Sequence, residues 1–213
     1  MIEAILWDND GVLVDTEHLY FQATREAMAT VSVPLSEQDY IDYLLKDSRG
    51  AWHLAVEAGV SATQINELKA QRNERYGELL VTETRIIDGV CETLAKLHGH
   101  YAMGIVTSSR RDHFEIIHAH SGLLTFFDFV LAGGDYARSK PAPDPYLAGI
   151  ERLGVPTNRC IAIEDSERGL QAALAAELRC LVIPSGMTRG GDFTGATSIL
   201  ENVRNVPGNI ATL

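Results

Sequence analysis

The chain has 213 residues, of which 46% are hydrophobic and 22% are charged, so its composition is that of a globular protein with a core. Its 29 acidic and 18 basic residues give a net charge of −11, which argues against nucleic acid or an anionic membrane as the main partner. The three cysteines include no Cys-x-x-Cys pair, the start does not resemble a secretory leader, and no apolar stretch is long enough to cross a membrane. We therefore expect a cytoplasmic protein, and its charge does not exclude a small anionic substrate bound beside a cation.

Two carboxylates follow the first apolar segment of the chain. Residues 4–7 predict a short buried strand that ends at Asp8 and Asp10, and Gly11 permits a sharp turn directly afterwards. Because neighbouring carboxylates repel each other and are costly to bury when ionised, the pair suggests a bound cation such as Mg²⁺. The alternative interpretation is a solvated turn after a strand, where Asp and Asn are common.

Helical patterns fill the next part of the chain. Thr16 is placed to cap the first helix, and Ser61 begins a segment that resembles a capping box for the last one. Strand-like segments stand before and after this helical part, which is typical of an insertion. We expect an all-helical cap domain over residues 16–83 and a core domain formed by residues 1–15 and 84–213.

Short apolar segments then alternate with helical patterns. This alternation predicts an α/β core, a Rossmann-like doubly wound parallel sheet with helices on both faces. In such sheets functional residues gather at the carboxyl ends of the strands, where Asp8, Thr107 and Asp165 are predicted to stand. The later strands are expected at residues 102–106, 129–132, 161–163 and 181–183, and a last short helix at 198–203.

The polar residues at these strand ends meet the requirements of phosphoryl transfer to water. Asp8 would be the nucleophile that forms an aspartyl phosphate, and Asp10 would protonate the leaving oxygen and then activate water. Lys140, which precedes two nearby prolines, would supply a fixed positive charge. Phosphate donors are expected from Thr107 and from the backbone around Ser108 and Ser109, and Mg²⁺ ligands from Asp8, Asp10, Glu164 and Asp165.

Each of these residues also has an interpretation without catalysis. Thr107 can cap the helix after its strand, and Lys140 can be a solvated surface charge. An acidic pair such as Glu164 and Asp165 at a helix start gains about 0.3–1 kcal/mol from the helix dipole. Their order along the chain and their shared placement at strand ends favour the functional interpretation.

Together these motifs resemble those of the haloacid dehalogenase superfamily, in the branch with a helical cap inserted after the first motif. The first motif corresponds to residues 8–17, and the second to Thr107 after Gly-Ile-Val. The third corresponds to Lys140 before Pro-Ala-Pro-Asp, and the fourth to residues 164–166. The resemblance spans nearly the whole chain, and it implies a Rossmann-like core and an aspartyl-phosphate intermediate.

The resemblance also implies a Mg²⁺ requirement. The metal would be held by Asp8, the main-chain carbonyl of Asp10, and Asp165, with Glu164 close by. Members of the superfamily that remove halide from carbon generally lack an acid two residues after the nucleophile. The presence of Asp10 therefore favours a phosphate substrate.

Within this branch the sequence resembles beta-phosphoglucomutase and phosphoglycolate phosphatase-like hydrolases. Arg49 and Arg72 fall where the mutase has cationic substrate contacts, Ser109 matches a substrate-side position, and Glu17 is a further expected substrate contact. Tyr20 stands where the mutase carries a histidine, which puts mutase chemistry in doubt. We expect a phosphatase for a small phosphorylated metabolite, favouring a sugar phosphate, that acts as a monomer or small homo-oligomer. The alternatives are a sugar phosphomutase and a phospho-accepting module like a receiver domain.

Overall fold

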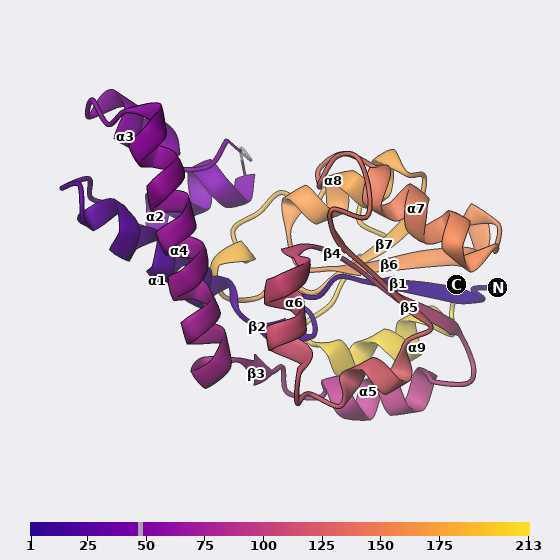
Figure 1. Ribbon diagram of the computed structural model, residues 1–213. Helices are drawn as coiled ribbons and strands as arrows, with labels where there is room; N and C mark the ends of the chain where they lie inside the picture. The colour runs from indigo at the N-terminus through magenta and orange to yellow at the C-terminus, as the bar shows by residue number, and fades with distance from the viewer. Residues whose placement is uncertain (47–48) are drawn as a thin grey trace. The chain divides into compact units, whose positions relative to one another are not determined.

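The computed structural model describes residues 1–46 and 49–213 (Figure 1). The chain divides into two compact units, one formed by Met1–Asp15 with Arg85–Leu213 and the other by Thr16–Thr84. The chain leaves the first unit after Asp15 and returns to it at Arg85. A short antiparallel ribbon lies at this point, in which β2 (Val14–Asp15) pairs with β3 (Arg85–Ile86).

The first unit is built on a six-stranded sheet with the spatial order β5-β4-β1-β6-β7-β8, and all of its pairings are parallel. The central strand β1 is apolar and buried along its whole length, as expected for a strand that is covered on both faces. This confirms the predicted doubly wound α/β core. The strands are β1 (Ala4–Trp7), β4 (Ala102–Arg110), β5 (Phe129–Gly133), β6 (Cys160–Glu164), β7 (Arg179–Val182) and β8 (Ser198–Ile199).

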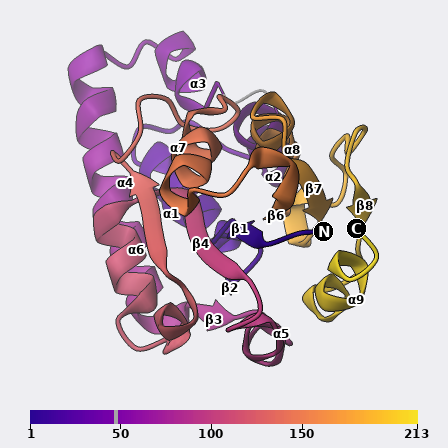
Figure 2. The same cartoon turned by 90° about the vertical axis from the view of Figure 1, so that its right-hand side faces the viewer.

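Helices cover both faces of this sheet, with α7 and α8 on one side and α5 and α9 on the other (Figures 1 and 2). Side chains alternate along β1 as the pleat requires: Ala4 and Leu6 pack toward α7 and α8, whereas Ile5 and Trp7 pack toward α5, α6 and α9. The helices are α5 (Val90–Leu97), α6 (Arg111–His118), α7 (Asp144–Leu153), α8 (Glu167–Ala175) and α9 (Val206–Ile210). Short 3₁₀ helices lie at Leu123–Phe126, Thr157–Arg159, Gly186–Thr188 and Val203–Asn205.

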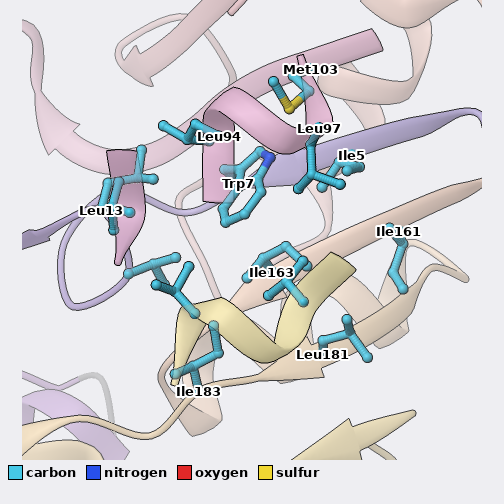
Figure 3. Close-up of a cluster of buried hydrophobic side chains, with 14 of the residues drawn as sticks. Ile5, Trp7, Leu13, Leu94, Leu97, Met103, Ile161, Ile163, Leu181 and Ile183 are labelled. Atoms are coloured by element: carbon cyan, nitrogen blue, oxygen red, sulfur yellow. The ribbon is translucent and has the colours of Figure 1, made fainter. Parts of the chain in front are cut away.

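Trp7 lies at the centre of the larger hydrophobic cluster. Its ring is fully buried among Leu94 and Leu97 of α5 and Ile163 of β6 (Figure 3). Burial of a large apolar surface contributes about 1.5–3 kcal/mol, part of which is offset here because the indole N–H has no hydrogen-bond partner among the described residues. The packing of the ring anchors the strand directly before Asp8. The position of the following loop is therefore fixed by the core.

The secondary structure of the second unit, in the residues described, is entirely helical. Its helices are α1 (Glu17–Ala29), α2 (Glu37–Tyr40), a π-helix (Ile41–Lys46), α3 (Trp52–Glu57) and α4 (Ala62–Glu83). The predicted capping box at Ser61 is confirmed, because its hydroxyl accepts from the Gln64 N–H and the Gln64 side chain accepts from the Ser61 N–H. Thr16 precedes α1 as predicted, but its side chain makes no capping bond to the described helix.

The predicted final helix over residues 198–203 is wrong. Residues 198–199 form strand β8, which adds to the edge of the sheet beside β7. The Leu200 N–H donates to the Val182 carbonyl at 2.8 Å, so the backbone groups of β7 find partners across the strands. Pairing in the folded chain overrides the weak local preference of this segment for a helix. Within the described ranges, no helix is both long and apolar enough to cross a membrane.

Candidate active site

The predicted site residues of the first unit follow the carboxyl ends of neighbouring strands. Trp7, the last residue of β1, is in register with Ile105 of β4 and Ile163 of β6. The polar residues just beyond these three positions therefore meet at one edge of the sheet. Thr107 is still within β4, which runs on to Arg110, but its pairing with β5 becomes irregular after Val106.

The loop after β1 wraps around a single carbonyl. The Asn9 carbonyl accepts hydrogen bonds from the N–H groups of Val12, Leu13 and Val14 at 3.3, 2.8 and 3.2 Å. Gly11 has a φ of +82°, which side-chain-bearing residues rarely adopt. A Cβ atom at this position would also lie 2.1 Å from Oδ2 of Asp165. Glycine is therefore required both by the turn and by the close approach of the Asp165 carboxylate.

Lys140 joins two of the predicted carboxylates. Its Nζ donates to Oδ1 of Asp8 at 2.7 Å, to Oε1 of Glu164 at 2.6 Å and to the carbonyl of Val106 at 2.9 Å. All three side chains are buried. Burial alone would lower the pKa of Lys140, but the charges of Asp8 and Glu164 outweigh it and raise the pKa above its ordinary value. Lys140 is therefore a permanent cation inside the site.

Tyr146 on α7 is a site residue that sequence reasoning missed. Its hydroxyl donates to Oε1 of Glu164 at 2.5 Å, and Nζ of Lys140 lies 4.9 Å from the centre of its ring. Burial and the nearby carboxylates raise the pKa of Tyr146, so the hydroxyl keeps its proton and remains a donor. In the sequence, only its position six residues after Lys140 could have indicated a role in the site. An aromatic residue in a helical pattern is more typical of the hydrophobic core.

The carboxylates of Asp8, Glu164 and Asp165 form a group that fits a divalent metal. One oxygen from each lies within 4.8 Å of the others, and all three residues are buried. Oε2 of Glu164 is buried without a hydrogen-bond partner among the described residues. Burial, followed by repulsion from Glu164, raises the pKa of Asp8 to about 7 despite the opposing effect of Lys140. Hard oxygen ligands with excess negative charge are those that Mg²⁺ prefers, so the donor set fits this ion.

The Asp10 carboxylate accepts hydrogen bonds from neighbouring side chains. Its Oδ2 accepts from the hydroxyls of Thr107 and Ser109 at 3.1 and 2.6 Å, and from Nδ2 of Asn9 at 3.3 Å. The Ser109 N–H in turn donates to the Thr107 hydroxyl at 3.0 Å. The hydroxyls of Thr107 and Ser109 thus contact Asp10 in this structure, and Ser108 lies between them on the same strand. A role for these three residues in binding phosphate stays a prediction.

His118, the last residue of α6, is the second residue that sequence reasoning missed. Its Nε2 lies 2.8 Å from Oδ1 of Asn9 and its Nδ1 lies 2.9 Å from the hydroxyl of Ser121. Burial lowers the pKa of His118 to about 4, although the charge of Asp10 acts in the opposite direction. The imidazole is therefore neutral at neutral pH. Nothing in the sequence distinguishes this histidine from one that only ends a helix.

The expected substrate contacts of the cap lie in the second unit. The guanidinium of Arg72 on α4 lies over the ring of Tyr20 at 4.3 Å and 5.8 Å from the ring centre of Trp52. Arg49 lies over a tyrosine ring of the π-helix at 5.4 Å, and Glu17 accepts a hydrogen bond from a tyrosine hydroxyl of α2. These contacts place the three residues within the helical unit, and their roles toward a substrate stay predictions.

The sequence matches the family described as haloacid dehalogenase-like hydrolases over residues 5–183. It is also 34% identical to the protein CbbY of Rhodobacter capsulatus, over 92% of this chain and 91% of that protein. The chain belongs to the haloacid dehalogenase-like hydrolases. The predicted family is thereby confirmed.

Two further relatives of this hydrolase have sugar phosphates in their descriptions. It is 28% identical to the fructose-1-phosphate phosphatase YqaB of Escherichia coli, over 81% of this chain and 91% of that protein. A crystal structure of a CbbY mutant from Rhodobacter sphaeroides in complex with xylulose-(1,5)bisphosphate superposes with a TM-score of 0.82 at 28% identity. This match covers 96% of each chain, so the similarity includes both compact units.

Gly169 on α8 leaves room for the Glu164 carboxylate, which gives a first prediction. A Cβ atom at this position would lie 1.9 Å from Oε2 and 2.0 Å from Cδ of Glu164. We expect Gly169→Ala to lower the free energy of unfolding by about 1–3 kcal/mol in urea titrations, because a packed and charged group must move. Gly208→Ala in α9 is the matched control, since a Cβ atom there has no neighbour within 4 Å among the described residues. Equal stability of the two variants would show that Glu164 moves at no cost.

The buried neutral imidazole of His118 gives a second prediction, about pH. Its pKa falls from about 6.5 in the unfolded chain to about 4 in the folded protein, so stability from this group is present above about pH 6.5 and is lost on acidification. Between about pH 8 and pH 5 the wild type should lose about 2 kcal/mol more than His118→Gln, which cannot titrate there. Parallel urea titrations of the two proteins at both pH values measure this difference. Parallel pH curves would contradict the assigned protonation state.

Proposed function

We propose that this hydrolase is a Mg²⁺-dependent phosphatase that acts on a small phosphorylated metabolite, with a sugar phosphate as the favoured substrate class. The observation that carries the proposal is the buried Lys140, whose Nζ lies 2.7 Å from the Asp8 carboxylate beside Glu164 and Asp165. The names of YqaB and of the CbbY complex support the sugar-phosphate class. A chemistry that transfers phosphoryl groups needs this combination of a carboxylate nucleophile and fixed positive charge.

Asp8 is the proposed nucleophile. Lys140 donates to its Oδ1, which fixes the position of that oxygen and keeps a positive charge beside the point of attack. The bond that forms joins a carboxylate oxygen of Asp8 to phosphorus, and the bond that breaks joins phosphorus to the ester oxygen of the substrate. Because Lys140 is buried and cannot move into solvent, it is already placed where charge gathers in the transition state.

Asp10 is the proposed acid and base. In the first step its carboxyl group gives a proton to the leaving ester oxygen, and in the second it takes a proton from the water that attacks the aspartyl phosphate. The hydroxyls of Thr107 and Ser109 hold its Oδ2 and so define where the carboxyl group stands. The loop that carries Asp10 also carries Asp8, which keeps the two acids in a fixed relation.

The proposed metal ligands are Asp8, Glu164 and Asp165, and the contribution of the Asp10 carbonyl is carried over from the family. When bound, Mg²⁺ supplies neutralising charge for the phosphate oxygens and for the carboxylates around them. Oε1 of Glu164 accepts hydrogen bonds from Lys140 and Tyr146. The main role of Glu164 is therefore to hold the Lys140 ammonium group in place. The Ser185 hydroxyl donates to Oδ2 of Asp165 at 3.4 Å. The Thr188 hydroxyl, which donates to the Ser185 carbonyl at 2.8 Å, lies 3.3 Å from the same Asp165 oxygen.

Replacement of Asp8 tests the proposed reaction. We expect Asp8→Asn to fold and to lower phosphate release from sugar monophosphates by about 1,000-fold or more, because an amide cannot form the aspartyl phosphate. Phosphate release from a panel of phosphorylated metabolites, with Mg²⁺ and with a chelator, is the measurement. Asp192→Asn is the control, since Asp192 is exposed and its side chain accepts a hydrogen bond from a backbone N–H of its own loop.

Three results would overturn this assignment. Full activity of Asp8→Asn would exclude Asp8 as the nucleophile. Conversion of a sugar 1-phosphate to a 6-phosphate, stimulated by a bisphosphate and with little phosphate released, would show a mutase. A single phosphorylation of Asp8 without turnover would show a phospho-accepting module.

A further inference from the structure

His118 is a buried titratable group that the proposed reaction does not use directly. It lies at the end of α6, in the same unit as Asp8 and Asp10, and its ring stacks at a tilt on Phe114 with 4.4 Å between ring centres. We propose that His118 is a positioning residue, which fixes the side chain of Asn9 and through it the carboxylate of Asp10. The inference rests on the proposed function of Asp10 as acid and base.

The orientation of the Asn9 amide follows from its two neighbours. Only the amide nitrogen can donate to the Asp10 carboxylate, and Nδ2 lies 3.3 Å from Oδ2 of that residue. The amide oxygen must then face the other way, where it lies 2.8 Å from Nε2 of His118. Asn9 is completely buried, so an oxygen without a donor at this position would be strongly unfavourable.

The same reasoning assigns the tautomer of His118. Because Oδ1 of Asn9 can only accept, the proton of the imidazole is on Nε2. Nδ1 is then an acceptor for the hydroxyl of Ser121 at 2.9 Å, and that hydroxyl accepts from the backbone N–H of Leu123 at 3.1 Å. The low pKa of His118, caused by burial, agrees with a neutral ring.

These bonds form a chain in which every donor points toward the site. It runs from the Leu123 N–H through Ser121, His118 and Asn9 to Oδ2 of Asp10. The backbone carbonyl of Asn9 already accepts hydrogen bonds within the loop, and the Asn9 side chain adds a hydrogen bond from this loop to α6. A change at His118 would release the Asn9 amide and weaken its hydrogen bond to Oδ2 of Asp10, beside those from Thr107 and Ser109.

Substrates with different leaving groups distinguish a role of His118 in positioning Asp10 from a role in stabilising the fold. An alkyl phosphate such as a sugar phosphate needs a proton on its leaving oxygen, whereas para-nitrophenyl phosphate releases a stable phenolate and needs little help. The value of kcat/KM reports the steps through formation of the aspartyl phosphate, where this difference acts. We expect His118→Leu to lower kcat/KM by about 10- to 100-fold for the alkyl ester and by less than about threefold for the aryl ester.

A double-mutant cycle tests whether His118 acts through Asn9. Asn9→Leu should reproduce the selective loss, and the variant with both substitutions should be no worse than Asn9→Leu alone, because the second change breaks a chain that is already broken. His118→Gln keeps an N–H donor near the position of Nε2 and should retain most of the alkyl activity. Ile117→Val, at a buried position of the same helix, is the packing control and should change both esters alike.

The hydrogen-bond chain can also be tested in the wild-type protein by NMR. This test needs neither an activity assay nor a variant that folds. Heteronuclear NMR of labelled imidazole nitrogens should show His118 neutral at pH 6, with the proton on Nε2 and slow exchange of that proton. A charged ring or a proton on Nδ1 overturns the inference, as does an equal loss of activity on both esters in His118→Leu. If the wild type releases no phosphate from any substrate, the proposed function fails instead, and the NMR result still decides the hydrogen-bond chain.

Discussion

The site depends on one buried cation. Lys140 lies between Asp8 and Glu164 and donates a hydrogen bond to each of them and to the carbonyl of Val106. Removing a lysine and two carboxylates from water is costly, and only close, fully hydrogen-bonded pairing offsets that cost. The pairing therefore holds the ends of β1, β4 and β6 at fixed distances, and the loss of any one member leaves a buried charge without compensation. Tyr146 and Gly169 support the same arrangement through Glu164.

The balance of charge around Lys140 explains why the site fits a metal. Asp8, Glu164 and Asp165 carry three negative charges when ionised, and Lys140 supplies one positive charge, which leaves an excess of two. In a buried site such an excess is relieved either by a proton or by a cation. The pKa of Asp8, raised to about 7, expresses the first possibility, and a bound divalent ion is the second. The excess of buried negative charge thus makes Asp8 hard to ionise in the absence of metal, and the same excess favours the binding of a metal ion.

The sequence predicted the parts of the site that follow from strand topology. Asp8 and Asp165 stand just after buried parallel strands, so their meeting at one edge of the sheet follows from the alternation of strands and helices. Lys140 is in a connection without a strand of its own, and only its motif indicated that it belongs here. The family and fold were predicted correctly, but helix 198–203 was not, because β8 depends on pairing with a distant strand.

The missed residues share a physical cause. Tyr146 and His118 are buried on helices, and one face of each helix packs on the sheet, so a pattern of apolar and polar residues assigns them to core or cap positions. Their hydrogen bonds depend on which face of the sheet each helix covers. The spacing of apolar and polar residues along the sequence does not indicate that face. Gly169 is similar, since a glycine in a helical pattern does not show that a carboxylate occupies the space of its side chain.

The loop after β1 is held from both faces of the sheet. Tyr146 belongs to the hydrophobic cluster on the α7 side and supports Asp8 through Glu164 and Lys140. His118 stacks on Phe114, which belongs to the cluster on the opposite side, and it contacts Asn9. The two acids of the loop therefore have separate supports, one ionic and one formed by neutral hydrogen bonds. This separation suits their proposed roles, because the nucleophile reacts as a charged carboxylate beside a cation, whereas the acid and base must be able to gain and lose a proton.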